Sequence, residues 1–516
     1  MTRHLAIVLH AHLPWVLGIP GDSPISFEEA WLHEAIWESY VPLLRTLESL
    51  PASAAGGPAL TLSLSPTLLA MLSSASLGPR FALYVDGVRA HLARARADHP
   101  DWAPAIADHE ARLDDAAAVV GRGGGRLVAP FVALAERRVI ELGTTAATHA
   151  HLPSLVTASS VRAQIRLGLR YFRELTGRHA RFFWLPECGF APRLAPLLVD
   201  SGAECTVLDT HAVELAEPRS AAGTFSPVFA HEPFAYFARD RELCRAIWSS
   251  EVGYPGAPEY RDFHAAPSRG SPFELALKPL RVTGDGPKSP YAPALARARA
   301  DRDAADFLSR VDRALDAAPS AAHDPVATVA FDAELFGHWW WEGPRFLEQV
   351  LLGAGDRRWR LATPTGLLDA DAELVLAQPA TSSWGRGGFS EVWSHPRVSH
   401  ALRLVHRAER RVLAVDVTVR DQPRTEVQRA ARLLAIRALL ELQSSDLLFM
   451  LRTGQASDYA EARVRALAST LDTLCEVALR PREEPGDRDV VSRHERRAPL
   501  FVELEEDALA DCFDPL

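Results

Sequence analysis

The chain has 516 residues, of which 47% are apolar and 24% are charged, so a disordered, collagen-like or coiled-coil protein is excluded. A chain of this length predicts roughly two to four domains, or one large barrel with additions. The formal net charge is −10, from 56 basic and 66 acidic residues. Because this charge offers no global basic field, we expect neither a nucleic-acid partner nor a membrane surface.

The cysteines and the first residues indicate a cellular compartment. Five cysteines are scattered without a CxxC pair, which excludes a zinc ribbon or a disulfide scaffold and suits a reducing environment. The apolar run 5–9 is too short for a signal peptide, and no stretch approaches the roughly 18 apolar residues of a membrane span. We therefore expect a soluble, cytoplasmic protein. The cysteines are Cys188, Cys205, Cys244, Cys475 and Cys512.

Short apolar runs that end abruptly in polar residues predict buried parallel strands, since both of their faces are apolar. These strands are predicted at 5–9, 60–64, 181–185, 205–209 and 326–331. Helical patterns at 161–175 and 191–203 alternate with them. The alternation predicts an α/β barrel, in which functional residues collect at the carboxyl ends of the strands.

The chain divides into four predicted segments. Residues 1–76 form the first part of the barrel, and the charge-rich residues 77–125 form a helical insertion that ends in a glycine loop. The barrel continues over 126–394, with a Pro-, Gly- and aromatic-rich loop at 250–296 that we expect to cross its mouth. Residues 395–516 form a helical C-terminal domain, because the strand signal disappears there and amphipathic helices follow.

The strand ends carry the residues that could do chemistry. His10 and His12 follow the first strand, Glu187 follows the strand at 181–185, and the pair Asp332 and Glu334 ends the strand at 326–331. Two carboxylates on separate strands, walled by aromatic residues, fit glycosidic bond chemistry, in which one attacks and the other shuttles a proton.

Twelve tryptophans are more than eight tyrosines would suggest, and eight of them neighbour Gly, Pro, His or acidic residues. We expect these eight to provide flat faces that stack on sugar rings. They are Trp15, Trp184, Trp248, Trp339, Trp340, Trp341, Trp384 and Trp393.

Three segments carry a resemblance to a known family: HAHLPW (10–15), WLPECGF (184–190) and FDAELFGHWWWEGP (331–344). They resemble the signature segments of glycoside hydrolase family 57, and within it the subgroup of 1,4-α-glucan branching enzymes. Further segments of the chain match in the same order, including SSWGRGGFSEVW (382–393) and LQSSDLLFMLRTG (442–454).

The resemblance implies an incomplete (β/α)7 barrel with a helical insertion and an all-helical C-terminal domain. It implies a retaining mechanism with Glu187 as the nucleophile and Asp332 as the acid/base. It also implies an α-glucan substrate (amylose, glycogen or a maltooligosaccharide), transfer of the cleaved chain to a 6-hydroxyl, and no metal or organic cofactor. The implied substrate-binding residues are His10, His12, Trp15, His149, Trp248, Trp339, Trp384 and Trp393.

Some positions depart from the family pattern. Ser444 to Leu447 read Ser-Ser-Asp-Leu where the family has Ser-Ser-Asp-Trp, and Ala222-Gly223 stands in place of a Tyr-Gly pair. The subgroup also carries a mobile loop with a tyrosine, for which Tyr236 is a candidate. These departures bear on transferase selectivity more than on bond cleavage.

Three other functions fit parts of the sequence. His10 and His12 could belong to a metal-dependent hydrolase, as in barrel-type polysaccharide deacetylases, although we expect the two side chains to point to opposite faces of an extended segment. The aromatic residues alone would suit a non-catalytic glucan-binding protein. A plain α-amylase of the same family would use the same two carboxylates and admit water instead of an acceptor chain.

The mechanism sets an expectation for protonation. Asp332 must hold a proton while Glu187 is ionised. Burial against Phe331, Trp339 and Trp340 should raise the pKa of Asp332, and the charge of Glu187 should raise it further.

Overall fold

The computed structural model describes residues 2–17, 24–50, 57–230, 234–249, 251–283, 286–419 and 424–496, together with residues 422, 500, 501, 504 and 513. Cys512 lies outside the described residues, and the other four cysteines are free and buried.

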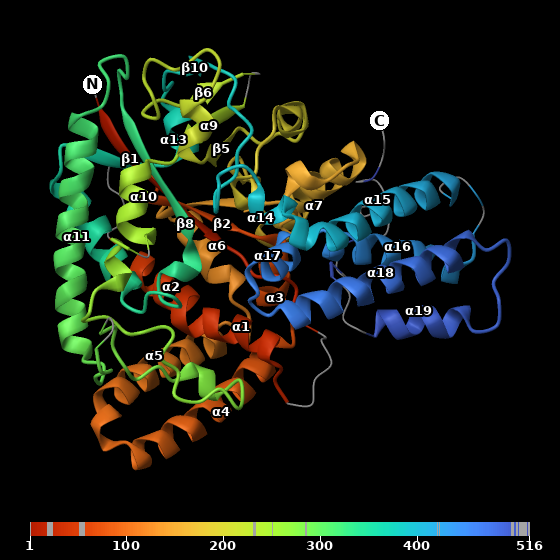
Figure 1. Ribbon diagram of the computed structural model, residues 1–516, viewed down its shortest axis with the longest axis horizontal. Coiled ribbons are helices and arrows are strands. Elements are labelled where there is room, and N and C mark those ends of the chain that lie inside the picture. The colour runs from red at the N-terminus through yellow and green to blue at the C-terminus, as the bar shows by residue number, and fades with distance from the viewer. Residues whose placement is uncertain are drawn as a thin grey trace.

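Parallel strands lie at the centre of the larger lobe (Figure 1). One sheet has the order β4-β3-β2-β1-β8, and β5 pairs with β7 in a second sheet. Single parallel bridges, Phe182 to Cys205 and Arg239 to Thr328, join the two sheets. Within the described residues these pairings close a ring of seven strands, which confirms the predicted incomplete (β/α)7 barrel. They are β1 (Arg3–Ala11), β2 (Leu60–Leu64), β3 (Ile140–Thr145), β4 (Phe183–Trp184), β5 (Cys205–Leu208), β7 (Ala235–Ala238) and β8 (Val326–Asp332).

Three short strands lie off this ring. β9 (Trp359–Ala362) pairs with the first residues of β1, and β6 (Val228–Phe229) runs antiparallel to β7. β10 (Val375–Leu376) extends the second sheet beside β6.

The sequence of β1 explains its central place. Leu5, Ile7 and Leu9 pack in the main core, whereas Ala6 and Val8 pack in a second cluster with inward residues of the other strands. Both faces of the strand are thus buried, as a strand with a helix layer on one side and the barrel interior on the other requires.

Helices surround the ring. The predicted helix at 161–175 is confirmed as α7, which begins after the N-cap Thr157 and ends at Gly177 in the left-handed region. The helix predicted at 191–203 is shorter than expected. The segment contains Pro192 and Pro196, and only a 3₁₀ turn and the short α8 form before Gly202. The helices around the barrel are α1 (Phe27–Ala35), α2 (Val41–Glu48), α3 (Pro66–Ser73), α6 (Val128–Glu136), α7 (Ala158–Thr176), α8 (Ala195–Val199), α9 (Thr210–Glu214), α10 (Arg241–Trp248), α11 (Pro293–Asp316), α12 (Gly343–Gly353) and α13 (Pro364–Asp369).

A helical hairpin of α4 (Leu77–Asp98) and α5 (Ala103–Arg122) extends below the barrel in Figure 1. The glycine loop after α5 packs against the start of α4: a Cβ atom on Gly78 would lie 2.8 Å from the Cα of Gly125. Glycine is therefore needed there for close backbone approach.

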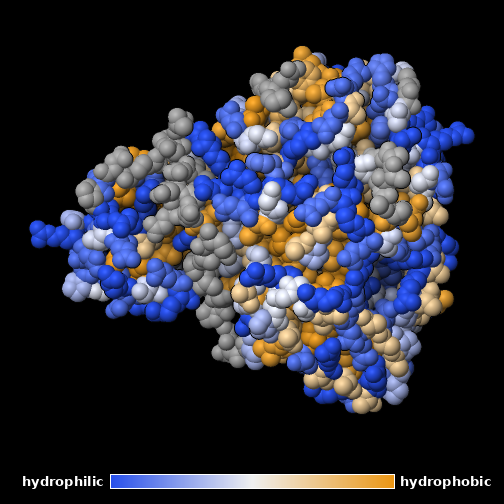
Figure 2. Space-filling view, turned by 180° about the vertical axis from the view of Figure 1, so that it is seen from behind, coloured by the Kyte–Doolittle hydropathy of each residue, from blue (hydrophilic) through white to orange (hydrophobic). Residues whose placement is uncertain are grey.

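The C-terminal helices form a separate lobe at the right of Figure 1, and α17 lies where this lobe meets the barrel. From behind, the smaller lobe stays distinct, and hydrophilic side chains cover much of both lobes (Figure 2). Among the described residues no single helix is long and apolar enough to cross a membrane, although the bent pair of α3 and α4 passes that test when taken together. The helices of this region are α14 (Glu391–Ser394), α15 (Ser399–Val419), α16 (Glu426–Leu442), α17 (Ser445–Thr453), α18 (Ser457–Leu479) and α19 (Asp487–Glu495).

Candidate active site

The strand register brings the sequence-predicted residues to one end of the barrel. His10 on β1 lies opposite Ser63 on β2 and opposite Asp332 on β8. All three stand at the carboxyl ends of their parallel strands, which is where α/β barrels build their sites.

Glu187 follows β4 on a turn with unusual backbone geometry. Pro186 opens a single 3₁₀ turn in which Glu187 has φ 63° and Cys188 has φ 48°. Residues other than glycine seldom occupy this left-handed region, and they persist there only when the surroundings enforce it. This enforced backbone geometry favours a functional assignment for Glu187.

Both carboxylate oxygens of Glu187 are engaged. The indole Nε1 of Trp384 donates to Oε2 at 2.7 Å, and the hydroxyl of Ser445 donates to Oε1 at 2.8 Å. Burial raises the pKa of Glu187 to about 7, helped by the charges of Asp446 and Asp332, while the two hydrogen bonds oppose the rise.

Asp332 has the higher pKa of the two predicted carboxylates. Burial raises it to about 8, in the direction expected from the sequence. The next contribution comes from the charge of Glu334, while His12 and Arg239 oppose the rise. The predicted repulsion between Asp332 and Glu187 appears in the raised pKa of Glu187. At neutral pH the two environments therefore favour a protonated Asp332 beside a partly ionised Glu187.

Glu334 is a third buried carboxylate at this end of the barrel. Its Oε1 accepts hydrogen bonds from the Tyr40 hydroxyl at 2.5 Å and from the backbone N–H of His12 at 3.0 Å. Burial raises its pKa to about 7. Tyr40 ends a π-helical turn, Ile36–Tyr40, between α1 and α2, and no sequence signal pointed to it.

His10 on β1 and His12 directly after the strand lie on the same side of the chain, which corrects our expectation of opposite faces. Residues two apart on a strand share a face, so both histidines continue the inward phase of Ala6 and Val8. Their rings stack at 5.8 Å, and His12 stacks on His149 at 3.9 Å.

The predicted histidines come together, but their ring nitrogens already have partners. His10 contacts Ser63 at 3.2 Å and His149 at 2.9 Å. His12 contacts Ser65 at 2.9 Å and Asp446 at 3.0 Å. The resemblance implies that these nitrogens contact substrate. Such contacts would have to replace the hydrogen bonds that the histidines make in the structure.

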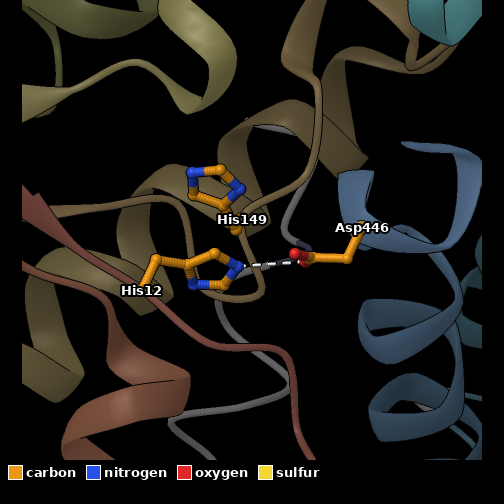
Figure 3. A group of neighbouring side chains, drawn as sticks. All are labelled: His12, His149 and Asp446. Atoms are coloured by element: carbon orange, nitrogen blue, oxygen red, sulfur yellow. Dashed lines mark hydrogen bonds and ion pairs between the residues drawn. The ribbon is translucent and has the colours of Figure 1, made fainter. Parts of the chain in front are cut away.

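His12, His149 and Asp446 have ligand-type atoms within 4.8 Å of one another, close enough for a cation to join them (Figure 3). The dashed line in Figure 3 is the direct His12 to Asp446 contact, and His149 is bonded to Ser445 and His10. These contacts explain the cluster without an ion, so we assign no metal to it.

The tryptophans divide into open and buried ones. The stacking prediction is wrong for Trp184, Trp340, Trp341 and Trp393, each at most 1% exposed, because they fill the interior. Trp393 lies with its ring stacked on His151 at 4.8 Å.

Other tryptophans keep accessible surface. Trp248 is 50% and Trp339 36% exposed, and their rings meet edge to face at 5.6 Å. Trp15 and Trp384 are half-buried. These four remain candidates for contacts with a glucan.

One further prediction is corrected. Tyr236 is not on a loop: it belongs to β7, is buried, and packs against Phe190 and Phe234. Leu447, where the family has a tryptophan, is buried on α17.

Sequence reasoning assigned no role to Ser445 and Asp446, although the segment 442–454 resembles the family. That resemblance was the only signal that could have found them, because they reach the barrel from another lobe.

Comparisons with known proteins agree with this geometry. The family model described as glycosyl hydrolase family 57 matches residues 6–353, and the model described as 1,4-alpha-glucan branching enzyme, C-terminal, matches residues 404–508. A probable 1,4-alpha-glucan branching enzyme of Mycobacterium tuberculosis is 30% identical over 495 residues, which are 89% of each chain.

Two solved structures resemble the whole chain. One is the family 57-type branching enzyme of Pyrococcus horikoshii, with a TM-score of 0.88 and 27% identity over 99% of this chain and 97% of that one. The other is the α-amylase AmyC of Thermotoga maritima, with a TM-score of 0.86 and 27% identity over 99% of both chains.

Proposed function

Because this chain belongs to glycosyl hydrolase family 57, we propose that it is a 1,4-α-glucan branching enzyme with Glu187 as nucleophile and Asp332 as acid/base. The observation that carries the proposal is the difference between the two buried carboxyl environments. Glu187 has two hydrogen-bond donors and a pKa of about 7, whereas Asp332 lies beside Glu334 and has a pKa of about 8.

The reaction has two displacements. Ionised Glu187 attacks the anomeric carbon of an α-1,4-linked glucose, and Asp332 gives its proton to the departing glycosidic oxygen. Asp332, now ionised, then takes the proton of an incoming 6-hydroxyl, whose oxygen displaces Glu187 and forms the α-1,6 branch. Retention follows because the anomeric carbon is inverted twice.

Branching and hydrolysis share the first displacement and differ in what attacks the glycosyl-enzyme. The match of residues 404–508 to the branching-enzyme C-terminal model supports branching. The similarity to an α-amylase keeps hydrolysis as the alternative. We include in the proposal a glycogen-type product and a cytoplasmic location.

Incubation with amylose, followed by debranching and sizing of the chains, tests the proposal. New α-1,6 linkages identify a branching enzyme, whereas rising reducing ends without new branches identify an amylase. Glu187→Gln and Asp332→Asn should each abolish both products. Full activity in either variant would refute the assignment of that carboxylate.

A further inference from the structure

A row of four side chains leads from β2 to the candidate nucleophile. The Ser63 hydroxyl lies 3.2 Å from Nδ1 of His10, and Nε2 of His10 lies 2.9 Å from Nε2 of His149. Nδ1 of His149 lies 2.9 Å from the Ser445 hydroxyl, which lies 2.8 Å from Oε1 of Glu187. We call Ser63, His10, His149 and Ser445 the serine–histidine chain.

Both histidines of the chain are neutral. They are buried, and none of their ring nitrogens makes a hydrogen bond to a carboxylate, the nearest being Oε1 of Glu187 at 3.7 Å from Nδ1 of His149. Burial lowers both pKa values well below the ordinary range, and the neighbouring imidazoles lower them further. Asp446 opposes this for His149 without reversing it. A neutral imidazole carries one N–H and one acceptor nitrogen.

These constraints give the chain one direction. An ionised Glu187 can only accept, so the Ser445 hydroxyl donates to it. The Ser445 oxygen then accepts from Nδ1–H of His149, which leaves Nε2 of His149 as an acceptor. His10 must donate to it from Nε2–H, and Nδ1 of His10 accepts from the hydroxyl of Ser63. Every hydrogen in the chain points toward Glu187.

We propose that the serine–histidine chain holds the Ser445 hydroxyl aimed at Glu187, which makes Ser445 and Ser63 positioning residues for the nucleophile. The inference rests on the proposed role of Glu187. Ser445 begins α17, so the helical C-terminal region supplies part of the nucleophile's environment.

Three groups outside the chain act on Glu187 and remain in the variants used below. Trp384 donates to Oε2, and the charges of Asp446 and Asp332 raise the pKa of Glu187. Any change in the Glu187 titration must therefore come from the chain.

The first test is the pH dependence of kcat/KM for branching of amylose. Ser445→Ala removes a hydrogen bond to the ionised form of Glu187, so the acid midpoint should move upward by about one pH unit. The alkaline midpoint, which reports Asp332, should stay. An unmoved acid midpoint in a variant with wild-type circular dichroism would overturn the proposal.

Ser63→Ala tests the remote end. Without its donor, His10 can adopt the other tautomer, and the chain can then reverse until Ser445 donates to His149. The acid midpoint should move in the same direction as in Ser445→Ala but less. The double variant should move no further than Ser445→Ala alone, because both act through one hydrogen bond. Additive shifts would overturn the single chain.

Thr61→Ala is the matched control, because it removes a buried hydroxyl two residues earlier on the same strand, where the partner is Glu141. Its acid midpoint should match that of the wild type. Glu187→Gln separates the nucleophile assignment from the positioning role of the chain. If Glu187→Gln retains activity, the nucleophile assignment is refuted. If Glu187→Gln is inactive and the pH profile of Ser445→Ala is unmoved, only the role of the chain is refuted.

Nitrogen-15 NMR of histidine-labelled wild-type protein tests the direction without Ser445→Ala. The resonances are assigned with variants in which one histidine at a time is replaced. His10 should then be the Nε2–H tautomer and His149 the Nδ1–H tautomer. The opposite pair of tautomers would overturn the proposal.

Discussion

Replacing Trp384 by phenylalanine separates two roles that alanine would remove together. The ring of Trp384 is half-buried and its Nε1–H donates to Oε2 of Glu187 at 2.7 Å. Phenylalanine keeps an aromatic face but has no donor. The ionised form of Glu187 then loses one of its two hydrogen bonds, while Ser445 still serves the other oxygen.

The size of the effect follows from that lost bond. A hydrogen bond to a charged group contributes about 1.5–3 kcal/mol, and one pKa unit corresponds to about 1.4 kcal/mol. The pKa of Glu187 should therefore rise by roughly one to two units from its present value of about 7. Because Asp332 still titrates near 8, fewer molecules combine an ionised Glu187 with a protonated Asp332. Near pH 7.5 the rate should fall by roughly tenfold.

Initial rates of amylose branching across pH measure this change. Trp384→Phe should move the acid midpoint upward and keep the ratio of branching to hydrolysis, since the aromatic face remains. Trp384→Ala should lower that ratio as well, because the face that would hold an acceptor chain and screen the intermediate from water is lost. If Trp384→Phe kept the wild-type acid midpoint, the indole hydrogen bond would have no part in tuning the nucleophile.

Four more outcomes are expected. The carboxyl groups of Glu187 and Asp332 should lie about 5–5.5 Å apart in a crystal structure, and about 9 Å in an undistorted site would argue for inversion and against transfer. Wild-type activity should peak between the two pKa values, about 7 and about 8, and a residual activity of Asp332→Asn with an intact alkaline limb would contradict the acid/base assignment. Glu334→Gln should lower the alkaline midpoint by about one pH unit, because the negative charge that raises the pKa of Asp332 is lost while an acceptor for Tyr40 remains. An unchanged midpoint would show that Glu334 does not raise the pKa of Asp332. Trp393→Ala should reduce the free energy of unfolding by about 3–5 kcal/mol in chemical denaturation, because a buried ring is removed, and a variant as stable as the wild type would contradict this structural role.

The sequence was enough to predict a barrel and its two candidate carboxylates, although it did not indicate β3 and β7. Strands buried on both faces appear as continuous apolar runs, and β1, β2, β5 and β8 follow such runs closely because parallel strands inside a helix layer tolerate few polar residues. Glu187 and Asp332 could be found because Asp332 is the last residue of β8 and Glu187 lies just beyond the end of β4. Parallel strands end at the same side of a barrel, so both side chains come to one place.

Tertiary structure alone decided how the rest of the site is built. Ser445 reaches Glu187 across 258 residues, and Asp446 reaches His12 across 434. Trp393 and Trp248 have similar polar sequence neighbours, yet one is buried and the other is half exposed. Local sequence encodes the period and the burial of an element, whereas these contacts depend on how the C-terminal helices dock on the closed barrel. That docking supplies the hydroxyl beside the nucleophile and the carboxylate beside His12.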